Sequence, residues 1–202
     1  MLDKRVSVAI IDDDLSTRNA LQVLLETDGV TVRVFHSVDE YLRIDASHPH
    51  NCIVLDPDNN GLDLQATLAK AKSPTPIVFV AARGDIRTSV HAMKAGAIEY
   101  LTKPFRKQEL LEAVRNGIER DRTRRAECRA LGELRTRLAS LTPREREIMA
   151  LLSAGREAKE IAGQIGISTH TARVHRTRVM SKIGARSIAD LVRMSDKLEH
   201  AG

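Results

Sequence analysis

The sequence of 202 residues contains very few aromatic side chains: Phe, Tyr and Trp together make up 2% of it, and Trp is absent. Aromatic side chains serve as stacking platforms for unpaired bases. Without them, a contact with nucleic acid would have to rest on charge and hydrogen bonds. Hydrophobic residues still make up 42% of the chain, which is enough for ordinary hydrophobic cores in one large domain or two small ones.

Cysteine and long apolar runs are also scarce. The two cysteines, Cys52 and Cys128, lie far apart, which excludes a disulfide framework and a cysteine-based metal cluster and fits a reducing cytosol. The apolar run near the start, Val6–Ile11, is only about six residues long and three aspartates follow it, so it is too short for a signal peptide or a membrane span. We expect a cytoplasmic protein without a membrane partner.

Charge is distributed unevenly along the chain. Residues 1–120 hold 15 Lys and Arg against 17 Asp and Glu, whereas residues 121–202 hold 17 against 10. The first part is close to neutral and the second is basic, which predicts two domains, the second with a polyanionic partner. Charge alone leaves nucleic acid and an ordinary solvated basic surface equally open.

The near-neutral part alternates between short apolar runs and longer amphipathic stretches. The runs are nearly continuous, as expected for strands that helices cover on both faces, and they predict a doubly wound five-stranded parallel sheet in an α/β domain. The predicted strands are Val6–Ile11, Thr31–Phe35, Cys52–Leu55, Ile77–Ala81 and Ile98–Leu101. The predicted helices are Thr17–Asp28, Asp39–Ile44, Leu62–Ala71, Arg87–Ala95 and Lys107–Arg120.

Polar residues follow several of these strands directly. Asp12, Asp13 and Asp14 follow the first strand, Asp56 follows the third, and Lys103 lies just after the fifth. The carboxyl ends of parallel strands meet at one edge of the sheet, where such folds bind ligands. Carboxylates gathered there need a cation, for which Mg²⁺ is suited, and a lysine beside them can pair with a phosphoryl group. The set predicts a magnesium-assisted phosphoryl acceptor with a carboxylate nucleophile, although any one aspartate alone would more commonly cap a helix.

Residues 5–120 resemble a response-regulator receiver domain, whose fold is flavodoxin-like. The resemblance rests on "IIDDD", on the aspartate that ends the third strand, on "AMKAGAIEYLTKPF" and on the spacing among them. It implies that Asp56 is the phosphoacceptor, that Lys103 pairs with the phosphoryl group and that Mg²⁺ is the cofactor. The metal ligands that it implies are Asp12, Asp13, Asp56 and the backbone carbonyl of Asp58.

Two features depart from the usual receiver pattern. The family usually has Thr or Ser at the end of the fourth strand, where the hydroxyl bonds a phosphoryl oxygen, and this sequence has Ala81. A missing charge-assisted hydrogen bond corresponds to roughly 1.5–3 kcal/mol. The loop after Asp56 reaches its glycine, Gly61, about three residues early, lacks the usual Met-Pro pair and contains Pro57, which has no backbone N–H. We expect an acceptor that is present but whose switch chemistry is atypical.

Residues 107–140 contain little Gly and no Pro, and apolar residues recur at helical spacing at both ends of this stretch. The last helix of the first domain is expected to continue into a long linker helix. Its polar middle, "ERDRTRRAECR", has no apolar stripe, which predicts a solvent-exposed stretch that bends or frays. The linker could dimerise or carry the signal, or it could be a solvated spacer.

The basic part of the chain contains start and stop signals for four helices. Thr142 as N-cap, Pro143 in the first turn and Glu145 at the third helical position form a capping box, and Gly155 ends that helix. The second helix "EAKEIAGQI", the turn "GIS" and the basic helix "THTARVHRTRVMSKI" then make a helix-turn-helix. A fourth helix, "SIADLVRMSDKL", follows.

The basic third helix carries its apolar residues, Ala172, Val179 and Ile183, on one side. Its other faces hold Thr, His, Arg and Lys side chains. This pattern suits a recognition helix in the major groove of DNA better than a solvated helix of a small bundle.

The segments "LTPREREIMALLSAG", "KEIAGQIGIS" and "TARVH" resemble the LuxR/FixJ-type DNA-binding domain, over residues 139–195. The resemblance implies an all-α four-helix domain of the helix-turn-helix type. The base contacts that it implies come from Arg173, Val174 and Thr177. The contacts to phosphate or sugar that it implies come from Lys159, Thr169, Thr171, His175 and Arg176. Ala158 stands where the family often has Asn, so one contact to the DNA backbone is lost.

Together these features predict a two-component response regulator of the FixJ/NarL type that regulates transcription. The predicted domains are a receiver in 1–121, a helical linker in 122–139 and a DNA-binding domain in 140–202. A sensor histidine kinase would phosphorylate Asp56, and the face formed by residues 86–101 would dimerise or release the DNA-binding domain. A homodimer would bind paired half-sites of double-stranded DNA, with RNA polymerase as a further partner.

Two other functions fit parts of the sequence. The protein could be a DNA-binding regulator that works without phosphorylation and uses its receiver-like domain for dimerisation or protein contact. It could also be an enzyme of phosphate-ester chemistry. The sequence has no Gly-rich phosphate loop and no second acid/base at a suitable spacing, so we do not expect an enzyme.

Overall fold

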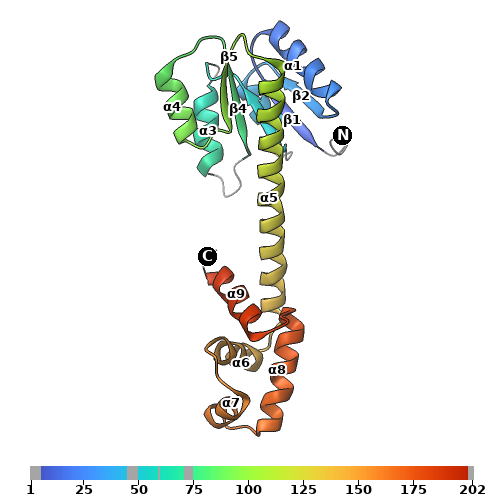
Figure 1. Ribbon diagram of the computed structural model, residues 1–202, viewed down its shortest axis with the longest axis vertical. Helices are drawn as coiled ribbons and strands as arrows, with labels where there is room; N and C mark the ends of the chain where they lie inside the picture. Colours follow the sequence, from blue (N-terminus) through green and yellow to red (C-terminus); the bar gives the residue numbers. More distant parts are fainter. Residues whose placement is uncertain (1–5, 45–49, 59, 71–74, 200–202) are drawn as a thin grey trace. The chain divides into compact units, whose positions relative to one another are not determined.

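Two units make up the chain, residues 1–124 and 125–202, and each is described by itself. The computed structural model describes residues 6–44, 50–58, 60–70 and 75–199 (Figure 1). The first unit alternates strands and helices as predicted. Its strands are β1 (Ser7–Ile11), β2 (Thr31–Phe35), β3 (Cys52–Leu55), β4 (Ile77–Ala81) and β5 (Glu99–Thr102). Its helices are α1 (Leu15–Thr27), α2 (Val38–Ile44), α3 (Gly61–Lys70), α4 (Ile86–Lys94) and the first part of α5 (Lys107–Ala139).

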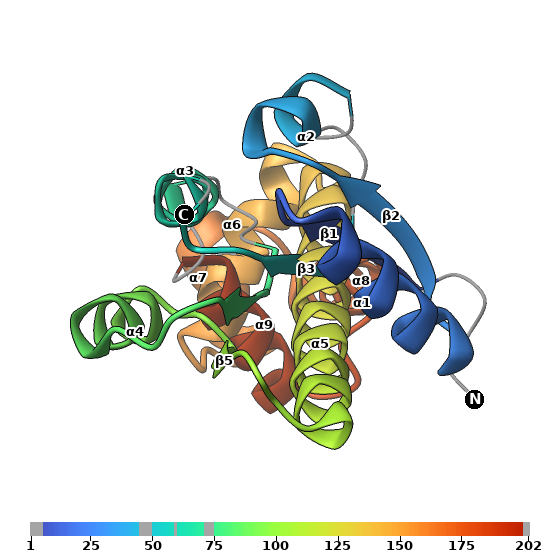
Figure 2. The same cartoon turned by 90° about the horizontal axis from the view of Figure 1, so that it is seen from above.

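The five strands form one parallel sheet in the order β2-β1-β3-β4-β5. Residues of α1 and α5 pack against one face of this sheet, and residues of α2, α3 and α4 pack against the other (Figure 2). This is the flavodoxin-like, doubly wound arrangement, so the predicted fold of the first domain is confirmed.

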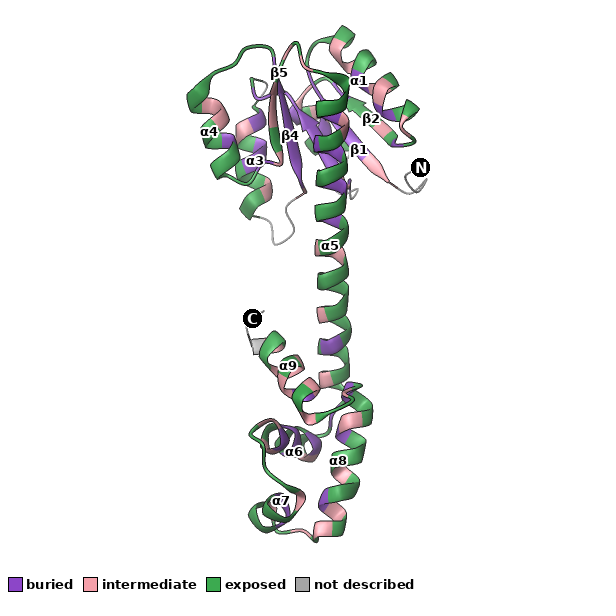
Figure 3. Cartoon of the chain, in the orientation of Figure 1, coloured by how far each residue is buried: buried purple, intermediate pink, exposed green. Residues whose placement is uncertain are grey.

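The continuous apolar runs of the sequence are explained by burial on both faces. Every residue of β3 and β4 is buried, as are all but the first residue of β1 (Figure 3). Successive side chains of a strand point to opposite faces, so Val8 and Ile10 enter one core while Ala9 and Ile11 enter the other. A strand covered by helices on both sides therefore has no polar alternation to show.

Helix boundaries differ from the predicted ones where a side chain caps the helix. The carboxylate of Asp14 accepts the N–H groups of Ser16 and Thr17, so α1 begins at Leu15, two residues before the predicted start. Asp85 caps α4 in the same way. The predicted end of the third helix, Ala71, lies outside the described residues.

Helix α5 is continuous from Lys107 to Ala139, so the prediction of a long linker helix is confirmed. Most of the polar stretch, residues 119–129, is exposed as predicted, but Asp121 is fully buried. The stretch is helical throughout, so the expected fraying was wrong. Leu134 is buried again and packs in the core of the second unit. No helix in the described ranges is both long and apolar enough to cross a membrane.

The second unit consists of the end of α5 and four further helices around one core. They are α6 (Pro143–Ser153), α7 (Ala158–Ile165), α8 (Thr169–Ile183) and α9 (Ile188–Glu199). The capping box of Thr142 and Glu145 is present, and Gly155 follows α6 with φ +77°, as the sequence signals predicted. On α8, Ala172, Val179 and Ile183 are all buried, which confirms the predicted apolar side.

Candidate phosphoacceptor site and nucleic-acid interface

The carboxyl ends of β1 and β3 bring the predicted acidic residues together. The backbone N–H of Asp56 donates to the carbonyl of Ile11 at 2.9 Å, which fixes the two strand ends side by side. Carboxylate oxygens of Asp12, Asp13 and Asp56 all lie within 4.8 Å of one another. Asp12 and Asp56 are buried, whereas Asp13 is exposed. The three offer hard oxygen ligands at one open edge, which suits a hydrated Mg²⁺ ion.

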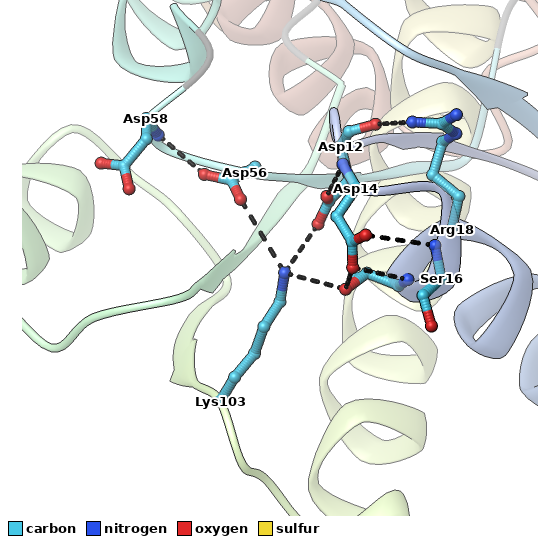
Figure 4. Close-up of polar contacts among 8 residues, drawn as sticks. Asp12, Asp14, Ser16, Arg18, Asp56, Asp58 and Lys103 are labelled. Atoms are coloured by element: carbon cyan, nitrogen blue, oxygen red, sulfur yellow. Dashed lines mark hydrogen bonds and ion pairs between the residues drawn. The ribbon is translucent and has the colours of Figure 1, made fainter.

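Lys103 reaches this cluster from the end of β5 (Figure 4). Its Nζ lies 2.8 Å from Oδ2 of Asp12 and 3.9 Å from Oδ2 of Asp56. The backbone N–H of Lys103 donates to the carbonyl of Ala81 at 2.9 Å, so the end of β4 belongs to the same edge. The structure therefore gathers the predicted acceptor, the acidic pair, the lysine and Ala81 at one end of the sheet.

The positive charge near Asp56 is not enough to offset the cost of burying its ionised carboxylate. Burial raises the pKa of Asp56, and the nearby charge of Asp12 raises it further. The N–H of Asp58 and the ammonium of Lys103 act in the opposite direction without cancelling that shift. A cation bound between the carboxylates would stabilise the ionised form, which is the nucleophilic one.

The shortened loop after Asp56 brings the main chain close to the acceptor. Asp58 donates its backbone N–H to Oδ1 of Asp56 at 2.8 Å, although the residue between them is a proline. Helix α3 begins at Gly61, where a Cβ atom would lie 2.3 Å from the carbonyl oxygen of Asp56. Glycine is thus required by close approach rather than by an unusual φ. The role of the Asp58 carbonyl as a metal ligand stays a prediction.

Ala81 occupies a buried position beside Thr102, its partner in the register of β4 and β5. Its methyl group can neither donate nor accept a hydrogen bond. The end of β4, at this edge of the sheet, therefore lacks the hydroxyl that the family usually supplies there.

Two residues of the site were missed by sequence reasoning. Thr17 donates its hydroxyl to Asp14 at 2.6 Å and accepts from Nζ of Lys103 at 3.3 Å. Arg18 donates to the backbone carbonyl of Asp12 at 2.6 Å. The capping pattern Asp14-x-x-Thr17 was a usable signal for the helix start, but nothing in it pointed to the lysine.

Most of the residues that were predicted to contact nucleic acid line a polar cleft between α7 and α8 of the second unit. The cleft has a volume of about 630 Å³ and is lined by Glu157, Ala158, Lys159, Thr169, Arg173, Arg176 and Thr177. Five of the eight predicted DNA-contacting residues therefore share one surface. Glu157, an acid at the start of α7, was not predicted there.

The remaining three predicted contacts lie elsewhere on α8. Val174 is 37% exposed, which suits contact with a thymine methyl group. Thr171 bonds the capping hydroxyl of Ser168 at 2.8 Å and is half-buried. His175 is half-buried, and its buried Nδ1 has no hydrogen-bond partner among the described residues. Their contacts with DNA stay predictions.

Comparison with known proteins agrees with both halves of this description. The family model "Response regulator receiver domain" matches residues 8–115, and "Bacterial regulatory proteins, luxR family" matches residues 139–195. Nodulation protein W of Bradyrhizobium diazoefficiens is 41% identical over 95% of this chain and 86% of its own length. The transcriptional regulatory protein FixJ of Rhizobium meliloti is 33% identical over 94% of both chains.

Solved structures give the same result. The response regulator StyR is 40% identical, with a TM-score of 0.82 over 95% of this chain and 98% of its own. Full-length FixJ from B. japonicum is 32% identical, with a TM-score of 0.58 over 97% and 98%. The names of two of these relatives describe a response regulator, StyR, and a transcriptional regulatory protein, FixJ. The chain belongs to the two-component response regulators that join a receiver domain to a LuxR-type DNA-binding domain, the FixJ family.

Proposed function

We propose that a sensor histidine kinase phosphorylates Asp56 and that this controls dimerisation and DNA binding. The observation that carries the proposal is the buried Asp56 carboxylate beside Asp12, with Nζ of Lys103 close to both. A carboxylate oxygen attacks phosphorus, the P–N bond of the phosphohistidine breaks, and the imidazole leaves with the electron pair and takes up a proton. Lys103 neutralises part of the negative charge that the transfer brings into the pocket.

Asp12, Asp13 and Asp56 are proposed to hold Mg²⁺, with the backbone carbonyl of Asp58 as a further ligand. The carboxylate cluster supports this proposal, because its oxygens lie close enough to share one ion. The ion, when bound, supplies charge stabilisation to the phosphoryl oxygens. Asp12 is held for this task on two sides, by Nζ of Lys103 and by the N–H of Asp14.

Ala81 is proposed to weaken the coupling between phosphorylation and the dimer face. A hydroxyl at this position would donate to a phosphoryl oxygen and draw the end of β4 toward it. The charge-assisted hydrogen bond that Ala81 cannot make corresponds to roughly 1.5–3 kcal/mol. The chemical step needs Asp56 and Lys103. The movement of the end of β4 toward the phosphoryl group needs the hydroxyl that Ala81 lacks.

The proposed dimer face lies on α4. Ile86, Val90 and Met93 follow one another at helical spacing, and they are 80%, 46% and 42% exposed. Large apolar side chains in a row on a helix surface are a common mark of a protein–protein contact. Apposition of two such stripes would join two copies of the chain across α4 and β5.

Two second units of such a dimer are proposed to read paired half-sites of double-stranded DNA. Arg173, Val174 and Thr177 would contact bases, and the contacts to phosphate or sugar would come from Lys159, Thr169, Thr171, His175 and Arg176. The proposal divides the chain into a receiver (1–121), a linker (122–139) and a DNA-binding domain (140–202). It also includes a cytoplasmic location, a contact with RNA polymerase and no enzymatic role.

The experiment incubates the chain with magnesium and a small phosphodonor and measures phosphoprotein and the monomer–dimer balance. We expect labelling of the wild type with a modest shift toward dimer, and a larger shift for Ala81→Thr. Ready, long-lived labelling with as strong a dimer shift as in a receiver that has the hydroxyl would contradict the role given to Ala81.

The same experiment with Asp56→Asn distinguishes this function from regulation without phosphorylation. Regulation that is unchanged in cells carrying Asp56→Asn would show that the receiver serves only as a contact domain. No comparison favours that alternative.

A further inference from the structure

Arg137, in the last turns of α5, makes a contact that the DNA-binding function above does not use. Its Nη1 donates to the backbone carbonyl of Ile183 at 3.2 Å. Ile183 is the last residue of α8, the recognition helix. Arg137 does not line the cleft between α7 and α8 that carries the predicted DNA contacts.

The contact falls on the part of α8 that most needs a partner. The last carbonyls of an α-helix have no N–H partner within the helix and carry partial negative charge. At this end the N–H groups of Gly184 and Ala185 both donate to the carbonyl of Met180. The guanidinium of Arg137 supplies a charged donor to the carbonyl of Ile183, which these turns leave open.

Gly184 shows how closely Arg137 approaches. Its φ is +80°, and a Cβ atom at this position would lie 2.6 Å from Nη1 of Arg137. Gly155, which follows α6, has nearly the same φ, +77°, but nothing lies within 4 Å of a Cβ atom built there. The two glycines therefore serve the same backbone conformation, and only Gly184 also makes room for a side chain from α5.

Further contacts hold the C-terminal end of α8 against α6 and against the end of α5. Nζ of Lys182 lies 2.6 Å from the buried carboxylate of Glu145 and 3.4 Å from the backbone carbonyl of Ser140, the residue after α5. Leu134 of α5 packs in the same core as Ile183. The end of α5 thus packs against the C-terminal end of the recognition helix.

We propose that Arg137 is a positioning residue for the recognition helix. It fixes the C-terminal end of α8 against the end of α5, and because α8 is a rigid rod this sets the direction of its base-contacting half. The inference rests on the proposed DNA-binding function and deepens it. The end of the linker helix would help to orient the recognition helix on DNA without touching DNA itself.

The first test measures DNA binding by the full chain. The probe is a duplex that the wild-type chain selects from a random pool, and a scrambled duplex of the same length is the comparison. Arg137→Ala should bind the selected duplex roughly tenfold more weakly, with little change on the scrambled one and an unchanged salt slope. Arg137→Gln, which keeps an N–H donor without the charge, should recover part of the loss.

Two outcomes overturn the proposal in this test. Equal losses on both duplexes together with a shallower salt slope would make Arg137 a phosphate contact. Unchanged binding of the selected duplex would make the contact irrelevant to reading. If the wild-type chain selects no sequence at all, the proposed DNA-binding function fails instead.

The second test needs no DNA and keeps the contact itself falsifiable. Hydrogen exchange is measured at the helix end beside each glycine, residues 180–185 for Gly184→Ala and residues 151–156 for Gly155→Ala, in full chains carrying each change alone and with Arg137→Ala. Both glycine changes strain a positive φ, so Gly155→Ala is the matched control. Gly184→Ala should accelerate exchange several-fold more than Gly155→Ala does. This difference should shrink when Arg137 is also replaced. Equal acceleration by the two glycine changes would overturn the contact.

Discussion

The two functional regions of the chain are built in opposite ways. The acidic site is assembled from residues as far apart in sequence as Asp12 and Lys103, which meet only because parallel strands end at one edge. The polar cleft of the second unit is lined by residues 157–177, a single continuous segment of two helices and a turn. The first is a buried site of convergent charge, and the second is an exposed surface of mostly one sign.

This difference predicts how each region responds to change. In the acidic site a few buried groups depend on one another, so the loss of one charge should remove the chemistry or shift the pKa of its neighbours. On the exposed helix surface each side chain acts nearly alone, and single replacements should produce graded, roughly additive losses.

The largest effect is expected from Asp56→Asn. The amide is a poor nucleophile, so labelling by a small phosphodonor in the presence of magnesium should fall to background. The measurement is the phosphoprotein formed over time. Asp63→Asn, which removes an exposed carboxylate from the first turn of α3, is the control and should label like the wild type. Persistent labelling of Asp56→Asn would place the acceptor elsewhere.

Graded losses are expected for the residues that line the cleft between α7 and α8. Arg173→Ala should cost about 1–3 kcal/mol of binding to a selected duplex and relax the preference at one base position. Lys159→Ala should weaken selected and unselected duplexes alike and reduce the salt slope by about one. Both are measured by titration at several salt concentrations. If the two variants behaved identically, the division into base and phosphate contacts would be wrong.

Magnesium should stabilise the receiver by binding the closely spaced carboxylates of Asp12, Asp13 and Asp56. Burial raises the pKa of Asp56 above its value in the unfolded chain. The stability that the protonated carboxyl contributes is therefore complete below the unfolded pKa, and it is lost as pH rises through the folded pKa. At neutral pH the charge therefore opposes folding, and Asp56→Asn should raise the unfolding temperature without metal. Magnesium at ten times its Kd should stabilise the wild type by about 1.4 kcal/mol and the variant by less. Equal stabilisation of both would remove Asp56 from the ligands.

A smaller effect, dependent on pH, is expected in the second unit. The hydrogen bond from Lys182 and the N–H of Thr142 lower the pKa of Glu145 to about 2, from 4.5. Because the folded pKa is the lower one, this stabilisation is present above about pH 4.5 and is lost as pH falls toward 2. Glu145→Gln should flatten the loss of stability between these values, as followed by hydrogen exchange in α6. Glu147→Gln, on the exposed side of α6, is the matched control and should not.

Much of the fold was predictable from sequence because it rests on local signals. The bounds of β2, β3 and β4 were predicted correctly, because each is a short run rich in apolar residues that favour strands. Helix α8 was predicted from Thr169 to Ile183, because Ser168 caps its start and Gly184 ends it. The convergence of Asp12, Asp56 and Lys103 followed from their places at the carboxyl ends of the predicted parallel strands.

The contacts that were not predicted join residues far apart in sequence through flexible side chains. Thr17 meets Lys103 across 86 positions, and Arg137 meets Ile183 across 46. Periodicity assigns such residues to a helix face but does not say which carbonyl or ammonium group lies opposite. The start of β5 was also shifted by one residue, because its pairing with β4 begins at Glu99 rather than at the apolar Ile98.

The most direct test of the account compares the wild type with Asp56→Asn in DNA binding, with and without a small phosphodonor and magnesium. The probe is the duplex selected by the wild-type chain, and the measured quantities are affinity and the size of the bound complex. The account predicts that the phosphodonor tightens binding of the wild type and favours a dimer on DNA, and that Asp56→Asn shows neither change. Equal tightening of both proteins, or none in a wild type that is demonstrably phosphorylated, would contradict control of DNA binding through Asp56.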